Sequence, residues 1–210
     1  MRVMVSVFEL DYFQPPYEKV TFPGKSEEEK ILYITRESPI FLGFRLISFS
    51  LVVAISMLVG AWLVVLGGKW LNLNDWFWLG AIFVLGAMVM FGGLWWIWQV
   101  YRKTLFIITT RRLTKFIHTT PWTRYQMSLG LDKVVDSGAY SKGYLQAWFH
   151  LGTFVARSSA GNIKNFKIIN IEYAEDLHNW MNKLMFTFNK ETEKLDEFRP
   201  FVAKKRGMRY

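Results

Sequence analysis

LISFSLVVAISMLVGAWLVVL (residues 46–66) and WFWLGAIFVLGAMVMFGGLWWIW (residues 76–98) decide the fold of this 210-residue chain. Neither stretch contains Asp, Glu, Lys, Arg or His. A helix needs roughly 20 apolar residues to cross a hydrocarbon core of about 30 Å, and both stretches reach that length. The alternative is a pair of buried helices in a soluble protein, but a chain of this size is too small to wrap them. The sequence therefore predicts an antiparallel transmembrane hairpin over residues 46–98, with a short loop at residues 67–75.

Aromatic residues gather at both ends of the two stretches. Trp favours the headgroup level of a bilayer, where its ring is in apolar surroundings and its N–H stays hydrated. The sequence predicts two sets of membrane-interface anchors, one at Trp70, Trp76 and Trp78 and the other at Trp95, Trp96, Trp98 and Tyr101.

The formal net charge of +9 is distributed in a way that predicts an orientation. The loop carries only Lys69 and Asp75, whereas Arg36 and Arg45 precede the first stretch. Five further cations follow the second stretch: Arg102, Lys103, Arg111, Arg112 and Lys115. The positive-inside rule then places both termini in the cytoplasm and the loop outside, as in a two-pass protein of the cell (inner) membrane.

Residues 1–45 are predicted to be a cytoplasmic N-terminal arm and lead-in. Residues 1–24 are a short strand, a membrane-surface segment or a loosely ordered arm ended by Pro15-Pro16. Ser26 and Glu29 form a capping-box pattern, which predicts a short helix or an extended lead-in through Ile31–Ile34.

Residues 99–188 change to a β pattern, with strands separated by turn residues. The predicted strands are 104–109, 112–118, 125–131, 134–140, 151–158 and 163–169, and residues 143–149 are ambiguous. An amphipathic helix follows, with Asn170 as its N-cap and a stripe of Leu177, Met181, Leu184 and Phe188. Residues 189–210 are predicted to be a mobile, charged tail.

Four short motifs resemble those of a known family. They are Ile108-Thr109-Thr110-Arg111-Arg112-Leu113, Leu131-Asp132-Lys133-Val134-Val135, Leu151-Gly152-Thr153 and the acidic lead-in Glu27-Glu28-Glu29. Together with the hairpin, they make residues 25–186 similar to bacterial membrane proteins that carry a pleckstrin-homology-like domain. The resemblance implies an α+β membrane protein whose hairpin is followed by a partly open, seven-stranded pleckstrin-homology-like β-barrel, capped by the C-terminal helix. It implies neither a ligand nor catalytic residues.

No enzyme motif emerges from the sequence. The three His residues are far apart, the chain has no Cys, and no phosphate-binding Gly-rich loop is present. We therefore predict a non-enzymatic protein without a cofactor or a metal site. A pocket holding convergent acids or His would reopen the enzyme alternative.

The cations after the second stretch are the one candidate binding site. Arg102, Lys103, Arg111, Arg112 and Lys115 either contact anionic lipid headgroups or only set the topology. We predict an adaptor anchored in the membrane that binds a protein partner or a second copy of itself on the cytoplasmic side. A sensor of anionic lipid headgroups is the alternative, and a lipid-modifying enzyme is the third. Nucleic acid is not an expected partner, because no exposed aromatic platform interleaves with the charges.

Overall fold

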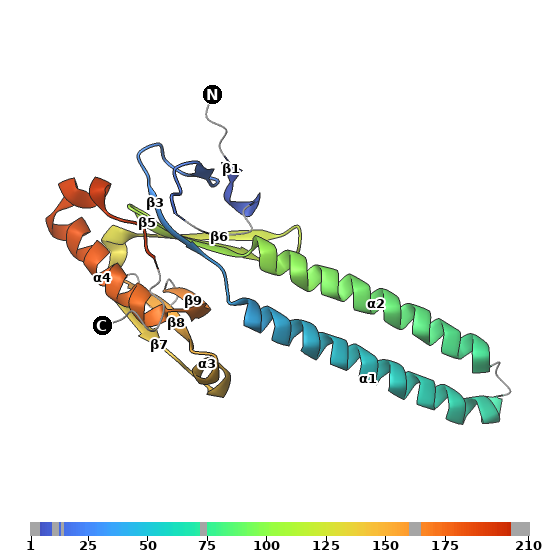
Figure 1. The fold of residues 1–210 in the computed structure, drawn as a ribbon. Helices are drawn as coiled ribbons and strands as arrows, with labels where there is room; N and C mark the ends of the chain where they lie inside the picture. Colours follow the sequence, from blue (N-terminus) through green and yellow to red (C-terminus); the bar gives the residue numbers. More distant parts are fainter. Residues whose placement is uncertain (1–4, 10–12, 14, 72–74, 160–164, 203–210) are drawn as a thin grey trace. The chain divides into compact units, whose positions relative to one another are not determined.

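The computed structural model describes residues 5–9, 13, 15–71, 75–159 and 165–202. It is a mixed α+β protein with two long apolar helices and three β-sheets (Figure 1). The helices make up one compact unit, Pro39–Tyr101, and the segments Met1–Ser38 and Arg102–Tyr210 make up the other. The chain on both sides of the hairpin therefore belongs to a single unit.

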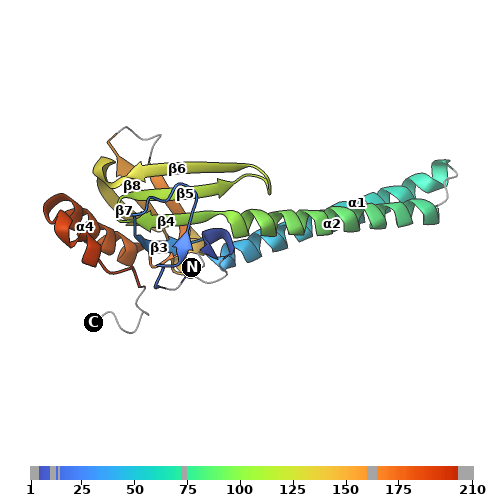
Figure 2. The ribbon, with the colours of Figure 1, turned by 90° about the horizontal axis from the view of Figure 1, so that it is seen from above.

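The hairpin unit consists of α1 (Pro39–Leu71) and α2 (Asp75–Lys103), which lie side by side (Figures 1 and 2). Both helices extend beyond the predicted apolar stretches at 46–66 and 76–98, so residues 67–71 and 75 of the predicted loop at 67–75 are helical, and 72–74 lie outside the described residues. Pro39 suits a first helical turn, where its missing N–H costs no hydrogen bond. At 1.5 Å per residue the helices are about 50 and 44 Å long, which is more than a hydrocarbon core requires.

The hairpin exposes apolar side chains over most of its surface. In the most apolar part of α1 only 6% of the residues are buried, and in that of α2 none is. A core helix of a soluble protein would show the opposite pattern. Both helices are thus long enough and apolar enough to cross a membrane.

Two glycines of α2 allow α1 to approach closely. A Cβ atom on Gly93 would lie 2.1 Å from Cζ of Phe49, and one on Gly86 would lie 2.4 Å from Sδ of Met57. Gly80, in contrast, has no atom of α1 within 4 Å of such a Cβ. Gly86 and Gly93 therefore belong to the helix–helix interface, and Gly80 does not.

The Gly93→Ala chain should be destabilised by about 1–3 kcal/mol, since the added methyl group overlaps the Phe49 ring. Gly92→Ala is the matched control, because a Cβ on Gly92 meets nothing within 4 Å. Alanine also favours helix over glycine, so the control should be neutral or slightly stabilised. Thermal unfolding in detergent micelles, followed by circular dichroism, measures the difference. Equal melting temperatures for the two variants would contradict the helix–helix interface described above.

A four-stranded antiparallel sheet contains β3 (Ile31–Thr35), β4 (Leu105–Thr109), β5 (Arg112–His118) and β6 (Arg124–Gly130), in that order. The hairpin is inserted between β3 and β4, which pair directly, with Thr35 opposite Phe106. Because these neighbours are antiparallel, the chain enters and leaves the hairpin at the same end of the sheet. We call this the hairpin end of the sheet.

The second sheet contains β7 (Val134–Tyr140), β8 (Leu151–Ser158) and β9 (Phe166–Glu172). The short helix α3 (Tyr144–Trp148) connects β7 to β8, and α4 (Ala174–Lys190) packs against both strands. The stripe predicted from the sequence is confirmed for Leu177, Met181 and Leu184, which are fully buried.

Strand β4 is buried on both faces, which explains why its sequence is apolar without alternation. Phe106 and Ile108 belong to a core shared with the second sheet and α4. Leu105 and Ile107 face the other way and pack with N-terminal residues: Val7, Tyr17, Val20 and Phe22. Residues of the N-terminal segment thus cover one face of the four-stranded sheet. Two of its short pieces, β1 (Val5–Ser6) and β2 (Val20–Thr21), pair as parallel strands.

A closed β-barrel is not found in the described part of the chain, so the predicted barrel is not confirmed. The seven strands β3–β9 form two separate sheets, one of four strands and one of three. The chain leaves β6 through a 3₁₀ turn, Leu131–Lys133, before β7 begins. The N–H of Leu131, the first residue of this turn, donates to the carbonyl of Arg111, which lies between β4 and β5 (2.9 Å). The 3₁₀ turn therefore lies between the last strand of the first sheet and the first strand of the second sheet.

Two further expectations about the C-terminal region are wrong. Asn170 does not cap α4; it lies within β9 with a left-handed φ of 57°, and Tyr173 occupies the cap position. The predicted tail is also partly packed, because Phe201 is buried and its N–H donates to the carbonyl of Leu32 (3.0 Å). Trp180 lies 5.6 Å from the ring centres of both Phe198 and Phe201, and these aromatic contacts hold the segment. The end of the tail, 203–210, lies outside the described residues.

Candidate functional site

The structure does not bring the five predicted cations together. Arg102 and Lys103 are the last residues of α2. Arg111 and Arg112 lie beyond β4, at the opposite end of the four-stranded sheet, and Lys115 lies within β5. A strand rises about 3.3 Å per residue, so β4 separates the two pairs by roughly 15–20 Å. Cations that are close in sequence are thus divided between the two ends of the sheet.

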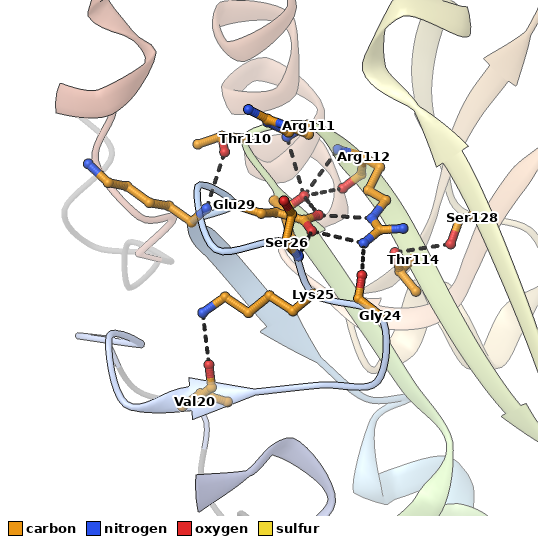
Figure 3. A network of polar contacts seen from close by, with 12 residues as sticks. Val20, Gly24, Lys25, Ser26, Glu29, Thr110, Arg111, Arg112, Thr114 and Ser128 are labelled. Atoms are coloured by element: carbon orange, nitrogen blue, oxygen red, sulfur yellow. Dashed lines mark hydrogen bonds and ion pairs between the residues drawn. The ribbon is translucent and has the colours of Figure 1, made fainter. Parts of the chain in front are cut away.

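Arg112 is part of a polar network with Glu29 (Figure 3). Its Nε donates to Oε1 of Glu29 and its Nη2 to Oε2, both at 2.9 Å. The Glu29 side chain is 1% exposed and the Arg112 side chain 27%. Arg112 also donates to the carbonyl of Gly24, and the Ser26 N–H donates to Oε2 of Glu29 (3.1 Å). The network therefore ties the lead-in before β3 to the turn between β4 and β5.

Thr109 is the centre of this turn. Its hydroxyl donates to Oε1 of Glu29 (2.6 Å) and accepts from the N–H of Arg112 (3.0 Å). Burial alone would raise the pKa of Glu29. The hydrogen bonds from Arg112, Thr109 and the Ser26 backbone outweigh that effect, so the pKa of Glu29 lies below its usual value of 4.5. The carboxylate is a buried anion with its hydrogen bonds satisfied, which indicates a structural role.

The lowered pKa of Glu29 predicts acid sensitivity. The folded state binds the proton less readily than the unfolded state, so the stabilisation is complete above pH 4.5 and falls as the pH drops below it. In a Glu29→Gln chain this side chain is neutral at every pH. The stability of that chain should therefore depend less on pH in this range. Melting temperatures of both chains, measured at several pH values in the same detergent, test the prediction. Parallel pH profiles would contradict it.

The sequence contained only part of the signal for this network. The Ser26–Glu29 pattern was interpreted as a capping box. The bond from the Ser26 N–H to the Glu29 carboxylate forms, but the chain continues as the strand β3 and not as a helix. The partner of Glu29 lies 83 residues away, across the hairpin. The sequence gives no sign of such a pairing.

Lys115 links the two sheets. Its Nζ donates to the carbonyl of Lys167 on β9 (3.1 Å) and lies 4.9 Å from the centre of the Phe106 ring. Burial lowers the pKa of Lys115, while the charge of Glu37 acts in the opposite direction. These contacts hold the Lys115 side chain between the two sheets, and its role in lipid contact stays a prediction.

The predicted aromatic anchors of the hairpin are mostly exposed. Exposed Trp side chains occur near both ends of α2: Trp76, Trp78, Trp95, Trp96 and Trp98. Tyr101 is half-buried, and the side chain of Trp70 lies outside the described residues. Their role as membrane anchors stays a prediction.

The second sheet has a pocket of about 410 Å³ at the end where β7 and β9 finish and β8 begins. It is bounded by α3 and by the first turn of α4. Its lining combines aromatic rings, carboxylates and an imidazole: Tyr140, Phe149, His150, Glu172, Tyr173 and Glu175, among others. The sequence did not predict this pocket, because its lining comes from five elements (β7, α3, β8, β9 and α4) that only the fold brings together.

Hydrogen bonds between side chains connect the pocket to the residues before α1. Buried Gln146 on α3 donates from Nε2 to Oδ1 of Asn170 (2.6 Å), and Asn170 donates from Nδ2 to Oε1 of Glu37 (2.6 Å). The N–H of Ser38 donates to the carbonyl of Asn170 (2.8 Å). The pocket is therefore fixed to the residues that immediately precede α1.

Backbone strain is concentrated around the same pocket. His150 and Tyr173 line it at φ values of 57° and 61°, and Asn170 has a φ of 57°. Residues other than glycine rarely adopt this left-handed conformation, and such strain often marks functional sites. Gly152 is also in the lining, and a Cβ there would lie 2.7 Å from the Cβ of Ala174. The close approach of β8 and α4 thus requires a glycine.

A Ser–His pair occurs elsewhere, between β7 and α4. The Ser137 hydroxyl lies 2.8 Å from Nδ1 of His178 and 2.9 Å from Oδ1 of Asn182. Ser137 is only 3% exposed and does not line the pocket. We assign these contacts to the attachment of α4 to the sheet, because a buried hydroxyl is not accessible to a substrate.

The chain matches no protein-family model, no curated protein and no solved structure.

Proposed function

We propose that the protein is a membrane-anchored adaptor whose folded domain faces the cytoplasm and binds a partner protein, or a second copy of itself, through the pocket of the second sheet. The hairpin is apolar enough to serve as the anchor. The four-stranded and three-stranded sheets, with α4 packed on the second, support a pleckstrin-homology-like domain. In this proposal the hairpin is an insertion between the first two strands of that domain.

The pocket is the observation that carries the proposal. It is concave and mixed in character, and it is attached through Asn170 to the residues that enter the membrane hairpin. Sites of this size that combine apolar surface with a few polar groups are typical of ligand recognition. In this proposal a ligand bound there is held close to the bilayer.

The lining indicates the chemistry of the partner. Glu172 and Glu175 provide negative charge, and Tyr140, Phe149 and Tyr173 provide ring faces that attract cations. A lysine or arginine side chain suits both features. We therefore propose that the partner presents a basic segment to this pocket.

The test compares full-length chains captured from solubilised native membranes. A chain with Glu172→Lys and Glu175→Lys should lose a partner, or a dimer, that the unchanged chain retains at defined stoichiometry. A chain with Glu193→Lys and Glu197→Lys is the matched control, because both residues are exposed and lie after α4. Identical partners and identical complex masses for all three chains would overturn the proposal.

A sensor of anionic lipid headgroups is the second candidate. Arg102 and Lys103 favour it, since they directly follow the apolar part of α2, where the inner leaflet is negatively charged. Arg111 and Arg112 pair with Glu28 and Glu29 and are poor positions for a test. Arg102→Gln should instead reduce the enrichment of anionic lipid around the chain in mixed-lipid nanodiscs. Unchanged enrichment would eliminate this candidate.

A lipid-modifying enzyme is the third candidate, and the pocket gives it one supporting observation. His150, Glu172 and Glu175 in one lining are residue types that perform acid–base chemistry. Incubation of the full-length chain with native membrane lipids, followed by mass spectrometry, should then reveal a product that a His150→Ala chain does not form. No product from either chain would eliminate the enzyme.

A further inference from the structure

The hairpin end of the four-stranded sheet also carries the β5–β6 turn, residues 119–123. Strands β4, β5 and β6 are antiparallel, and His118 pairs with Arg124 at the end where β4 begins (Figure 2). Lys103, the last residue of α2, donates from Nζ to the carbonyl of Pro121 (2.9 Å). The N–H of His118 donates to Oγ1 of Thr104 (3.3 Å). The turn is therefore fixed beside the point where α2 ends.

Helix α3 is connected to the same boundary from the other sheet. Gln146 of α3 bonds to Asn170, and Asn170 bonds to Glu37 and Ser38, which immediately precede α1. Hydrogen bonds thus connect both the β5–β6 turn and α3 to residues where the folded domain joins a hairpin helix.

Both elements present large aromatic side chains to their surroundings. Trp122 in the turn is 77% exposed, and on α3 Tyr144 is 94% and Trp148 78% exposed. Leu145 of α3 is also exposed. Three large side chains are thus exposed together on the five-residue helix α3, and contiguous exposed apolar surface marks interaction sites. Both elements are connected by hydrogen bonds to residues at which the folded unit joins the hairpin. This connection indicates what the exposed rings contact.

That environment is the interface of the bilayer. Trp and Tyr favour the headgroup level, where the ring is in apolar surroundings and the N–H or O–H stays hydrated. The helix from Trp98 to Lys103 rises only about 7.5 Å, so the end of α2 remains close to the headgroups. Nearby Arg102, Lys103 and Lys142 add positive charge that suits lipid phosphates.

We propose that the β5–β6 turn, through Trp122, and α3, through Tyr144 and Trp148, insert into the headgroup region of the same membrane that the hairpin spans. These contacts are a second attachment to the membrane, which does not span it. They hold the domain against the bilayer and set how the pocket beside α3 is presented. The inference rests on the hairpin being in the membrane, as in the proposed function, but not on any partner of the pocket.

The absence of Cys from the chain makes a site-specific test direct. Single cysteines at Trp122, Trp148 and Val135 are labelled with a polarity-sensitive fluorophore in full-length chains. The chains are placed in nanodiscs of phosphatidylethanolamine and phosphatidylglycerol that contain a nitroxide-bearing lipid. Val135 is the matched control, because it is 69% exposed but lies at the opposite end of β7 from Tyr140.

Labels at 122 and 148 should be quenched about threefold or more relative to the label at 135, as expected for interfacial side chains. A label at Trp95, inside the hairpin, reports separately on the anchor. If position 95 is quenched but 122 and 148 behave like 135, the inference is overturned while the anchor stands. If position 95 is not quenched, the anchored adaptor itself is overturned. A label at Thr123, which leaves Trp122 in place, should reproduce the result at 122; its failure to do so would also count against the inference.

Discussion

We expect the Arg112→Ala chain to lose about 3–5 kcal/mol of stability, because the substitution leaves the Glu29 carboxylate buried without its countercharge. The loss should appear as a decrease of about 10 °C or more in the melting temperature of the folded domain. The substitution removes two hydrogen bonds to Glu29 and one to Gly24, so the lead-in should detach from the β4–β5 turn. Tryptophan fluorescence of the full-length chain in detergent measures the effect.

Arg111→Ala is the matched control for this prediction. Arg111 pairs with Glu28 in the same turn, but the two side chains are 54% and 76% exposed. An exposed ion pair contributes about 0–1 kcal/mol, so this variant should melt close to the unchanged chain. A double-mutant cycle of Glu29→Gln and Arg112→Ala should also show strong coupling between the two residues. Equal losses for Arg111→Ala and Arg112→Ala would show that the network does not stabilise the fold.

The second large effect concerns the attachment of α4. Leu184 is fully buried between α4 and the two sheets, and Leu184→Ala should cost about 2–5 kcal/mol through lost burial and the cavity that remains. Thermal unfolding of the full-length chain in detergent measures this loss. Phe186→Ala, two residues along the same helix, removes a larger side chain that is 53% exposed, and it should cost much less. A greater loss for Phe186→Ala would mean that α4 packs through another face.

The sequence was sufficient for the features that depend on local pattern. The uncharged stretches predicted both long helices, and alternation or β-branched runs predicted strands close to β4, β5, β6, β7 and β8. The stripe of Leu177, Met181 and Leu184 predicted the buried face of α4. In each case the signal repeats along a single element, where the period of 3.6 or 2 residues is visible.

Features that depend on contacts between distant residues were not predictable. Asn170 was predicted to be the N-cap of the C-terminal helix, yet its side chain bonds to Gln146 and Glu37. The N-terminal segment gave no sign of its packing on β4, because only the fold shows that β4 needs cover on both faces.

The candidate site shows the same difference between local and distant information. The five cations form one group in the sequence, but an intervening strand places Arg111 and Arg112 far from Lys103. The pocket, in turn, joins residues from Tyr140 to Glu175 that carry no common motif. Residues that come from the ends of several strands and helices form no periodic pattern in the sequence, so such a binding site cannot be predicted from it.

The central claim is that the hairpin spans the membrane with its loop outside and the folded domain inside, and cysteine accessibility in intact cells tests it most directly. Two chains are compared, Asp75→Cys at the hairpin loop and Ser159→Cys after β8, because the unchanged chain has no cysteine that would react. A membrane-impermeant maleimide should label position 75 in intact cells and position 159 only after the cells are lysed. Labelling of position 159 in intact cells, with position 75 protected, would contradict the claim.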